Sequence, residues 1–387
     1  MNSKTLCVAG KNDIAVNILG YIRHKYKYYE LLAVMNGNES YIDSWQHSAG
    51  LYCRCNNIPI VTLDDIYPVK NLVFISVEFD RIIIPSKFAS EHLFNLHFSL
   101  LPKYKGCNTS IMPILHGESE SGVTLHRIRR GIDTGEIIAQ RKFAIDFDCT
   151  GLDLYRKYID AGSSLVIEYL DKLINNDFTE EAQNWVNSEY FSRNEINYSN
   201  LQLDTGRTAW QIHNQIRAFA FRPYQLLKFR NCGLIGSTIT ENVSTERPGT
   251  ILEETETHFL LSTIDYDICV YKDVLNDLLA AVREDDNERA KYLCEFRRII
   301  KETDNNGVSP MSLAQSRNNS EMIRFFMGKT LDTAELSRYN QSTEHRAQSL
   351  IYSQLTEEYT SSLIRNIFTG GRFHLRRNYV YPQASSF

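Results

Sequence analysis

Hydrophobic residues up to about position 180 alternate between runs typical of strands and spacings typical of helices. A β-rich run at residues 5–9 is followed by apolar residues at helical spacing between Ile14 and Ile22, and then by the run LLAVMN. The near-continuous apolar run NLVFISV, at 71–77, is typical of a strand buried on both faces of a parallel sheet. Further strands are expected near 92–99, 122–129 and 137–145, and an amphipathic helix near 151–176. The alternation predicts an α/β fold with a Rossmann-like, mostly parallel sheet.

The pattern changes beyond this first part of the chain. A helix at 207–220 and several short β-rich runs, among them HFLLSTI and DICVYK, predict a small, mostly-β domain. From Asp273 the pattern is purely helical, and DNNGVSPMSLAQSRNNSEMIRFFMG resembles an ankyrin repeat, with a turn at Asn306–Gly307 and a helix opened by Ser309–Pro310. We therefore expect three domains. Their predicted ranges are 1–200 for the α/β domain, 201–272 for the β-rich domain and 273–387 for the ankyrin-like helical domain.

Composition restricts the class of protein and its partners. The 387 residues are 43% hydrophobic, with no run near the roughly 18 apolar residues of a membrane span and no secretory signal, which predicts a cytoplasmic protein without a membrane partner. Eight scattered cysteines are expected to be free thiols, and no Cys or His cluster predicts a metal site. The net charge is −5, the pI is near 6.1 and no basic stripe is visible, so nucleic acid is not an expected partner.

Two segments carry candidate chemistry. In HLFNLHFSLLPKYKG the two-residue period of a strand places Asn95 and His97 on one face, and an α/β sheet binds ligands at such strand ends. Asp133 lies downstream between two glycines, in a tight connection between two β-like runs. An amide, an imidazole and a carboxylate suit acyl transfer without a covalent intermediate. His97 would accept the proton of an attacking amine, Asn95 would stabilise the oxyanion, and Asp133 would orient His97 or assist proton transfer. Structural roles for all three residues remain open from the pattern alone.

The segment NLHFSLLPKYKG followed by GVTLHRIRRGIDTGEI resembles the signature of the folate-dependent formyltransferases. The resemblance, which covers roughly residues 1–270, implies that Asn95, His97 and Asp133 form a catalytic triad and that 10-formyltetrahydrofolate is the formyl donor. It also implies ligand contacts for further residues, although Phe79 and Ile82 could equally be ordinary core residues and Lys11 a solvated lysine. The implied donor contacts are Phe79, Asp80 and Ile82, and the implied substrate contacts are Lys11, Asn12, Arg222 and Tyr224.

The resemblance also indicates an acceptor. Lys105 precedes Gly106 where tRNA-acting members carry arginine, and the opening VAGKNDIAVNIL resembles the sugar-acting members. Joined to an ankyrin-like unit, these features resemble the enzymes that formylate a dTDP-linked 3-amino-3,6-dideoxyhexose, gluco or galacto, for O-antigen synthesis in lipopolysaccharide. A homodimer is expected, with a dimerisation or small-ligand role for the ankyrin-like unit. The alternatives are a dTDP-4-amino-4,6-dideoxyglucose N-formyltransferase, a formyltetrahydrofolate hydrolase and a non-catalytic ankyrin scaffold.

Overall fold

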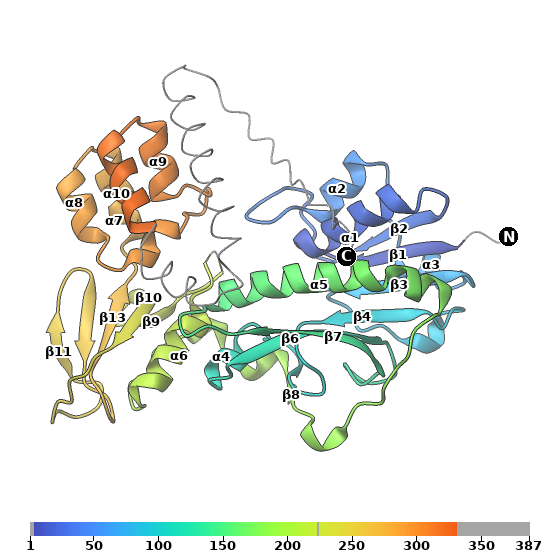
Figure 1. The fold of residues 1–387 in the computed structure, drawn as a ribbon, viewed down its shortest axis with the longest axis horizontal. Coiled ribbons are helices and arrows are strands. Elements are labelled where there is room, and N and C mark those ends of the chain that lie inside the picture. The colour runs from blue at the N-terminus through green and yellow to red at the C-terminus, as the bar shows by residue number, and fades with distance from the viewer. Residues whose placement is uncertain (1–3, 223, 331–387) are drawn as a thin grey trace, which may run out of the picture. The chain divides into compact units, whose positions relative to one another are not determined.

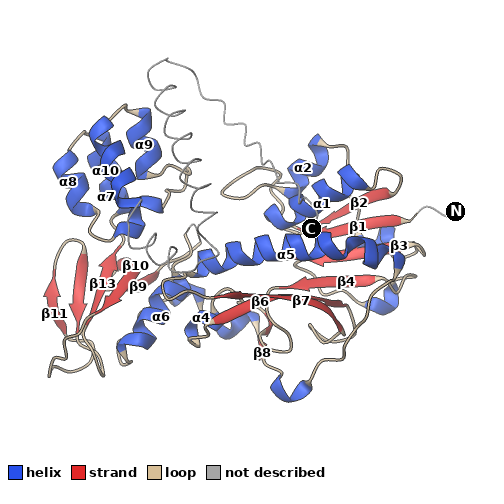
Figure 2. Cartoon of the chain, viewed as in Figure 1, coloured by secondary structure: helices blue, strands red, loops and turns tan. Residues whose placement is uncertain are grey.

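The computed structural model describes residues 4–222 and 224–330. The chain separates into two compact units, residues 1–323 and 324–387. Two larger sheets, the two-stranded pair of β5 and β8, and most of the helices belong to the first unit (Figures 1 and 2). None of the helices in the described part of the chain is both long enough and apolar enough to cross a membrane.

The larger sheet has six strands in the order β2-β1-β3-β4-β6-β7. Strands β1 to β4 are mutually parallel, whereas β6 and β7 run antiparallel to their neighbours. The predicted α/β fold with a mostly parallel sheet is therefore confirmed. The strand bounds are β1 Thr5–Gly10, β2 Glu30–Met35, β3 Leu72–Val77, β4 Leu93–His97, β6 Glu120–Arg127 and β7 Ile137–Ala144.

The strand order reverses at β1, because β2 lies on one side of it and β3 on the other. In open α/β sheets ligands bind outside the carboxyl ends of the strands at such a switch point. Here the carboxyl ends are close enough to require glycine, since a Cβ added at Gly10 would lie 1.9 Å from the carbonyl oxygen of Val77. The fold thus places the ends of β1, β3 and β4 around one region.

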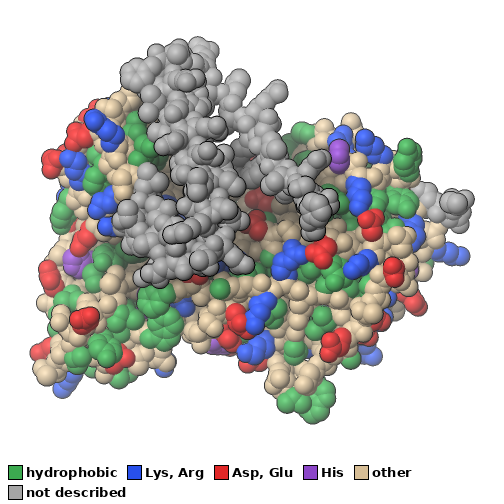
Figure 3. Space-filling model, viewed as in Figure 1, with side chains coloured by type: hydrophobic (Ala, Val, Ile, Leu, Met, Phe, Trp, Pro, Cys, Tyr) green, Lys and Arg blue, Asp and Glu red, His purple; other side chains and the backbone are tan. Residues whose placement is uncertain are grey.

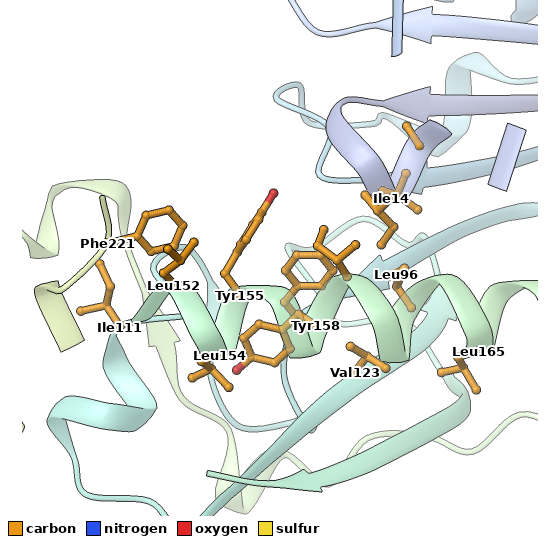
Figure 4. Close-up of a cluster of buried hydrophobic side chains, with 14 of the residues drawn as sticks. Ile14, Leu96, Ile111, Val123, Leu152, Leu154, Tyr155, Tyr158, Leu165 and Phe221 are labelled. Carbon is orange, nitrogen blue, oxygen red and sulfur yellow. The ribbon is translucent and has the colours of Figure 1, made fainter. Parts of the chain in front are cut away.

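Helices cover both faces of this sheet. On one face α1 (Asn12–Lys25) packs against the long helix α5 (Gly151–Asn175), and their apolar side chains join those of the strands in one core. Figure 4 shows Tyr155 and Tyr158 of α5 in this core together with Leu96 and Val123 of the sheet. On the other face the short helix α3 buries two residues beside β1 and β3. The remaining short elements are α2 Ala49–Cys55, α3 Leu63–Ile66, β5 Lys105–Gly106, α4 Met112–Leu115 and β8 Tyr190–Phe191.

The second sheet has five antiparallel strands in the order β11-β12-β13-β10-β9, and helix α6 packs on β10. This separate sheet confirms the expected β-rich part, while the domain boundaries at 200 and 272 stay predictions. The bounds are α6 Ala209–Phe219, β9 Leu227–Phe229, β10 Cys232–Ile239, β11 Ile251–Glu254, β12 His258–Leu261 and β13 Ile268–Lys272.

Only helices follow β13 in the described residues. The Ser309 side chain caps a helix that has Pro310 at its first position, and Gly307 adopts φ 76° in the preceding turn, as the repeat pattern predicted. The ankyrin assignment itself stays a prediction, and residues 331–387 of the expected unit lie outside the described residues. The helices are α7 Leu275–Arg283, α8 Asn287–Leu293, α9 Pro310–Ser316 and α10 Ser320–Thr330, with a 3-10 helix at Arg297–Lys301.

Candidate functional site

A cavity of about 800 Å³ opens where the carboxyl ends of β1, β3 and β4 meet. Asn95, His97 and Asp133 all lie on its wall, so the structure brings the three predicted catalytic residues into one place. Asn95 and His97 reach it because alternate residues of β4 point to the same face of the sheet. His97 is buried, with 7% of its surface exposed.

Asp133 is held by the connection between β6 and β7. It adopts φ 51°, and a Cβ added at Gly135 would lie 1.8 Å from the carbonyl oxygen of Arg127, so this tight turn requires glycine. Asp133 Oδ2 accepts a hydrogen bond from the Gly106 amide at 2.9 Å and lies 3.5 Å from His97 Nδ1. Asn95 Nδ2 donates to the other carboxylate oxygen at 3.4 Å. The carboxylate therefore contacts both other predicted catalytic side chains.

The surroundings of His97 determine which ring nitrogen carries a proton. Nε2 lies 2.7 Å from the carbonyl oxygen of Tyr104, which can only accept, so Nε2 is the donor. In the neutral ring Nδ1 is then the basic nitrogen, and it faces Asp133. Burial alone would raise the pKa of Asp133, but His97, His126 and the Gly106 amide outweigh it and hold that pKa well below its usual range. A carboxylate therefore faces the position where an imidazolium charge would form.

His126 is a site residue that the sequence interpretation missed. It lies on β6 directly opposite Asn95, and its Nδ1 is 2.7 Å from the carbonyl oxygen of Arg127. Nδ1 is therefore protonated, so Nε2 accepts a hydrogen bond from Asn95 Nδ2 at 3.0 Å. The second N–H of Asn95 makes only the long contact with Asp133, which leaves it able to turn towards a developing oxyanion. His126 thus orients the Asn95 amide.

The residues assigned to the formyl donor line the same cavity. Ile82 is 75% exposed, which contradicts the alternative that it is an ordinary core residue. Phe79 is half-buried and packs on the core of the β1 and β3 face, with the Arg81 guanidinium 4.7 Å from its ring centre. Asp80 Oδ2 accepts from the Gly37 amide at 2.7 Å, so this carboxylate also ties its loop to the end of β2.

Three of the four residues assigned to the substrate line a second, smaller hollow of about 90 Å³. They are Lys11, Asn12 and Tyr224, and Lys11 lines both cavities. Arg222 lines neither of these cavities, because its guanidinium pairs with Asp273 at 2.6 Å and with Glu302 at 3.2 Å. The structure therefore separates Arg222 from the other predicted substrate residues.

An aromatic cluster beside the smaller hollow was also missed. Trp45 packs edge-on against Tyr224, with ring centres 5.6 Å apart, and Phe221 stacks on Tyr224 at 5.2 Å. Tyr155 of α5 completes the group, and Figure 4 shows it near Phe221. Trp45 stands alone among polar residues in the sequence, so only the fold reveals that it joins aromatic residues from distant segments.

Neither disulfides nor a metal cluster are found in the portions of the chain with defined placement. All eight cysteines lie there and are free thiols in the structure. No group of three His, Cys, Asp or Glu side chains in the same residues could hold a metal ion.

Comparison with known proteins relates the chain to formyl transferases. A family model described as formyl transferase matches residues 64–170. The chain is 44% identical to WlaRD, a sugar 3N-formyl transferase solved in the presence of dTDP and 5-N-formyl-THF, over 70% of this chain and 99% of that one, with a TM-score of 0.66. It is also 44% identical to an N-formyltransferase from Helicobacter canadensis in complex with folinic acid and dTDP-3-aminofucose, with the same coverage and a TM-score of 0.65.

Curated relatives match a shorter stretch. Methionyl-tRNA formyltransferase from Synechococcus sp. (strain JA-3-3Ab) is 36% identical over 150 residues, which are 38% of this chain and 46% of the relative. The enzyme of the same name from Thermotoga neapolitana is 32% identical over 160 residues, or 41% of this chain and 50% of the relative. The chain thus spans about half the length of these curated relatives.

Proposed function

Because the chain belongs to the formyltransferase family, we propose that it transfers the formyl group of 10-formyltetrahydrofolate to the amino group of a dTDP-linked 3-amino-3,6-dideoxyhexose. The observation that carries the chemistry is the meeting of Asn95, His97 and Asp133 on the wall of one cavity. The acceptor is supported by the two solved relatives at 44% identity, one a sugar 3N-formyl transferase and the other bound to dTDP-3-aminofucose.

The proposed mechanism is direct attack of the acceptor amine on the formyl carbon. As the new C–N bond forms, His97 Nδ1 takes the amine proton and Asp133 stabilises the resulting imidazolium, 3.5 Å away. The N–H of Asn95 that makes the long contact with Asp133 turns to donate to the oxyanion, a contribution that typically amounts to about 3–4 kcal/mol. When the bond to the donor nitrogen breaks, His97 returns the proton to that nitrogen, so the enzyme ends as it began.

We assign the formyl donor and the acceptor to different parts of the two cavities. The exposed Ile82, with Phe79 and Asp80, offers an apolar wall and a polar edge suited to the flat pterin of the donor. Lys11 lies on the border of both cavities, where an ammonium can contact the diphosphate of the acceptor. Asn12 and Tyr224 line the smaller hollow beside the aromatic cluster and are assigned to the nucleotide.

Arg222 is not assigned to the nucleotide, because two carboxylates already compensate its charge. A nucleotide-sugar acceptor also agrees with the charge of the protein better than tRNA does. In Figure 3 basic and acidic side chains are interspersed on the part of the surface that the view leaves uncovered. We further propose that the enzyme is a cytoplasmic homodimer that supplies O-antigen synthesis, and that its ankyrin-like unit serves dimerisation or binds a small ligand.

Incubation of the full chain with 10-formyltetrahydrofolate and a panel of dTDP-amino sugars tests the proposal. We expect mass spectrometry to detect a formylated 3-amino sugar, gluco or galacto, and His97→Asn to abolish turnover while the protein stays folded. Formylation of the 4-amino sugar alone would move the acceptor to that class. Release of formate without any formylated sugar would indicate a hydrolase. No formyl transfer at all from a protein that binds the donor would refute the proposal and favour a scaffold.

A further inference from the structure

Glu78 is a carboxylate inside the main cavity that the catalytic scheme does not use. It directly follows β3, lies on the cavity wall with Lys11 and adopts φ 50°, a left-handed conformation that non-glycine residues rarely take. Asn36 fixes this backbone by donating from Nδ2 to the Glu78 carbonyl oxygen at 2.9 Å. Uncommon backbone conformations that neighbours stabilise are concentrated at ligand sites. The conformation therefore marks Glu78 as a residue worth a functional explanation.

Hydrogen bonds connect Glu78 to the smaller hollow. Its Oε2 accepts from the Tyr155 hydroxyl at 2.7 Å and from Asn12 Nδ2 at 3.5 Å. The Tyr155 oxygen in turn accepts from Asn12 at 3.2 Å and from Gln46 Nε2 at 3.1 Å, and both of these residues line the smaller hollow. Glu78 is therefore held on the side of the main cavity that adjoins the proposed nucleotide site.

The same part of the wall presents acceptors without protein donors. Tyr155 and Asn12 both bind Oε2, and Oε1 makes no hydrogen bond to any residue whose placement is described. Asn36 is 5% exposed, and its Oδ1 is buried without a partner among those residues. Burial raises the pKa of the Glu78 carboxyl, against the opposing effects of Tyr155, Lys11 and Asn12. A ligand in the cavity that brings a hydrogen-bond donor would satisfy Glu78 Oε1.

We propose that Glu78 positions the acceptor sugar, with Oε1 accepting a hydrogen bond from a ring hydroxyl next to the reacting amine, while Asn36 holds the Glu78 backbone in place. This rests on the proposed function, since it needs an amino hexose in the cavity. A 3-amino-3,6-dideoxyhexose carries a hydroxyl on each side of its amine, and either hydroxyl could donate a hydrogen bond to Oε1. Tyr155 fixes Oε2 and thereby leaves Oε1 aimed at the ligand. Glu78 is a positioning residue and takes no proton in the reaction.

The Glu78→Gln variant tests the proposal in the formylation assay. Loss of a hydrogen bond to a charged group should lower kcat/KM for the acceptor about 10- to 100-fold, mainly through KM, while KM for the donor stays unchanged. Acceptors that lack one or the other flanking hydroxyl give the decisive comparison. One of them should lower kcat/KM of the wild type by a similar factor and cause little further loss in the variant, because the same contact is already missing.

Further variants keep the test independent of folding. Tyr155→Phe frees Oε2 but retains the carboxylate, so it should raise the acceptor KM by a smaller factor. Glu168→Gln is the matched control, because this exposed carboxylate on α5 pairs with Arg141 alone among the described residues and its loss should leave both KM values unchanged. The inference would be overturned if Glu78→Gln left kcat/KM for the acceptor unchanged. It would also be overturned if, for both hydroxyls, the loss caused by the variant and the loss caused by the analogue simply multiplied, because the two changes would then act independently. Formylation by the wild type in the same assay would leave the proposed function intact in that case.

Discussion

Replacing Asp133 by asparagine isolates the electrostatic part of the proposed mechanism. The substitution preserves the size of the side chain and an acceptor for the Gly106 amide, but it removes the negative charge 3.5 Å from His97 Nδ1. Both side chains are largely buried, with 8% of His97 and 11% of Asp133 exposed, so water screens the pair poorly. The variant should therefore bind both substrates and fail to stabilise the imidazolium.

The expected size follows from the distance. Two unit charges 3.5 Å apart attract by about 5 kcal/mol at the effective dielectric of about 20 that suits proteins. Since each 1.4 kcal/mol changes a rate about tenfold, kcat should fall by up to about 10³-fold. Steady-state kinetics with both substrates varied measures this loss, and we expect KM for donor and acceptor to change little.

The same variant makes a prediction about stability. The pKa of Asp133 is lowered in the folded state, so the group contributes stability above its unfolded pKa of about 3.9 and loses it as the pH falls through the folded pKa. The difference in unfolding free energy between wild type and Asp133→Asn should be constant near neutral pH and shrink only in acid.

A surface pair provides the control for this experiment. Asp171→Asn removes an exposed carboxylate paired with Lys25 and should leave kcat unchanged. If Asp133→Asn kept more than about a tenth of the wild-type kcat, the charge would contribute under 1.4 kcal/mol and the electrostatic role would be refuted.

Three further substitutions test other contacts. Asn95→Ala should lower kcat about 10²- to 10³-fold with both KM values nearly unchanged; a pure KM effect would contradict an oxyanion role. Lys11→Ala should raise the acceptor KM about tenfold and make that KM less dependent on salt concentration, because ions screen exposed charge pairs. An equal salt dependence of the acceptor KM in the wild type and the variant would exclude the phosphate contact. Arg298→Ala removes hydrogen bonds to Asp153 and the Thr150 hydroxyl, so the free energy of unfolding measured in urea should fall by about 1–3 kcal/mol. An unchanged free energy of unfolding would mean that this ion pair makes no net contribution to stability.

The three residues proposed to be catalytic could be recognised in the sequence because their signals are local. Asn95 and His97 share a face by the two-residue period of β4, and the glycines around Asp133 mark a tight turn, so each residue is recognisable within a few positions of sequence. The contacts between these residues depend on how the strands pair, and pairing cannot be predicted from a single segment of sequence. His126 was missed for this reason, since only the antiparallel pairing of β4 and β6 sets it opposite Asn95.

Arg222 is the opposite case, a residue that the sequence analysis included among the substrate contacts and that the structure pairs elsewhere. Its position in IRAFAFRPY suggested a ligand contact, but its charge is compensated by Asp273 and Glu302, which follow the β-rich segment and come close only in the folded chain. Tyr224, two positions away, does line the smaller hollow. Local resemblance therefore pointed to a segment that borders the smaller hollow, whereas long-range ion pairing engages the Arg222 side chain elsewhere.

The N-terminal end of α5 contacts both the helical segment after β13 and the residue proposed to position the acceptor. Thr150 caps the helix, and the Asp153 carboxylate both completes the cap and accepts a hydrogen bond from Arg298 in the helical segment that follows the β-rich sheet. Tyr155, two residues further on, holds Glu78 in the main cavity. The cap and the contact with Arg298 both stabilise the N-terminal end of the helix that carries Tyr155. Arg298 thus connects the helical segment after β13 to the end of α5 that carries Tyr155, and no described residue of that segment lines either cavity.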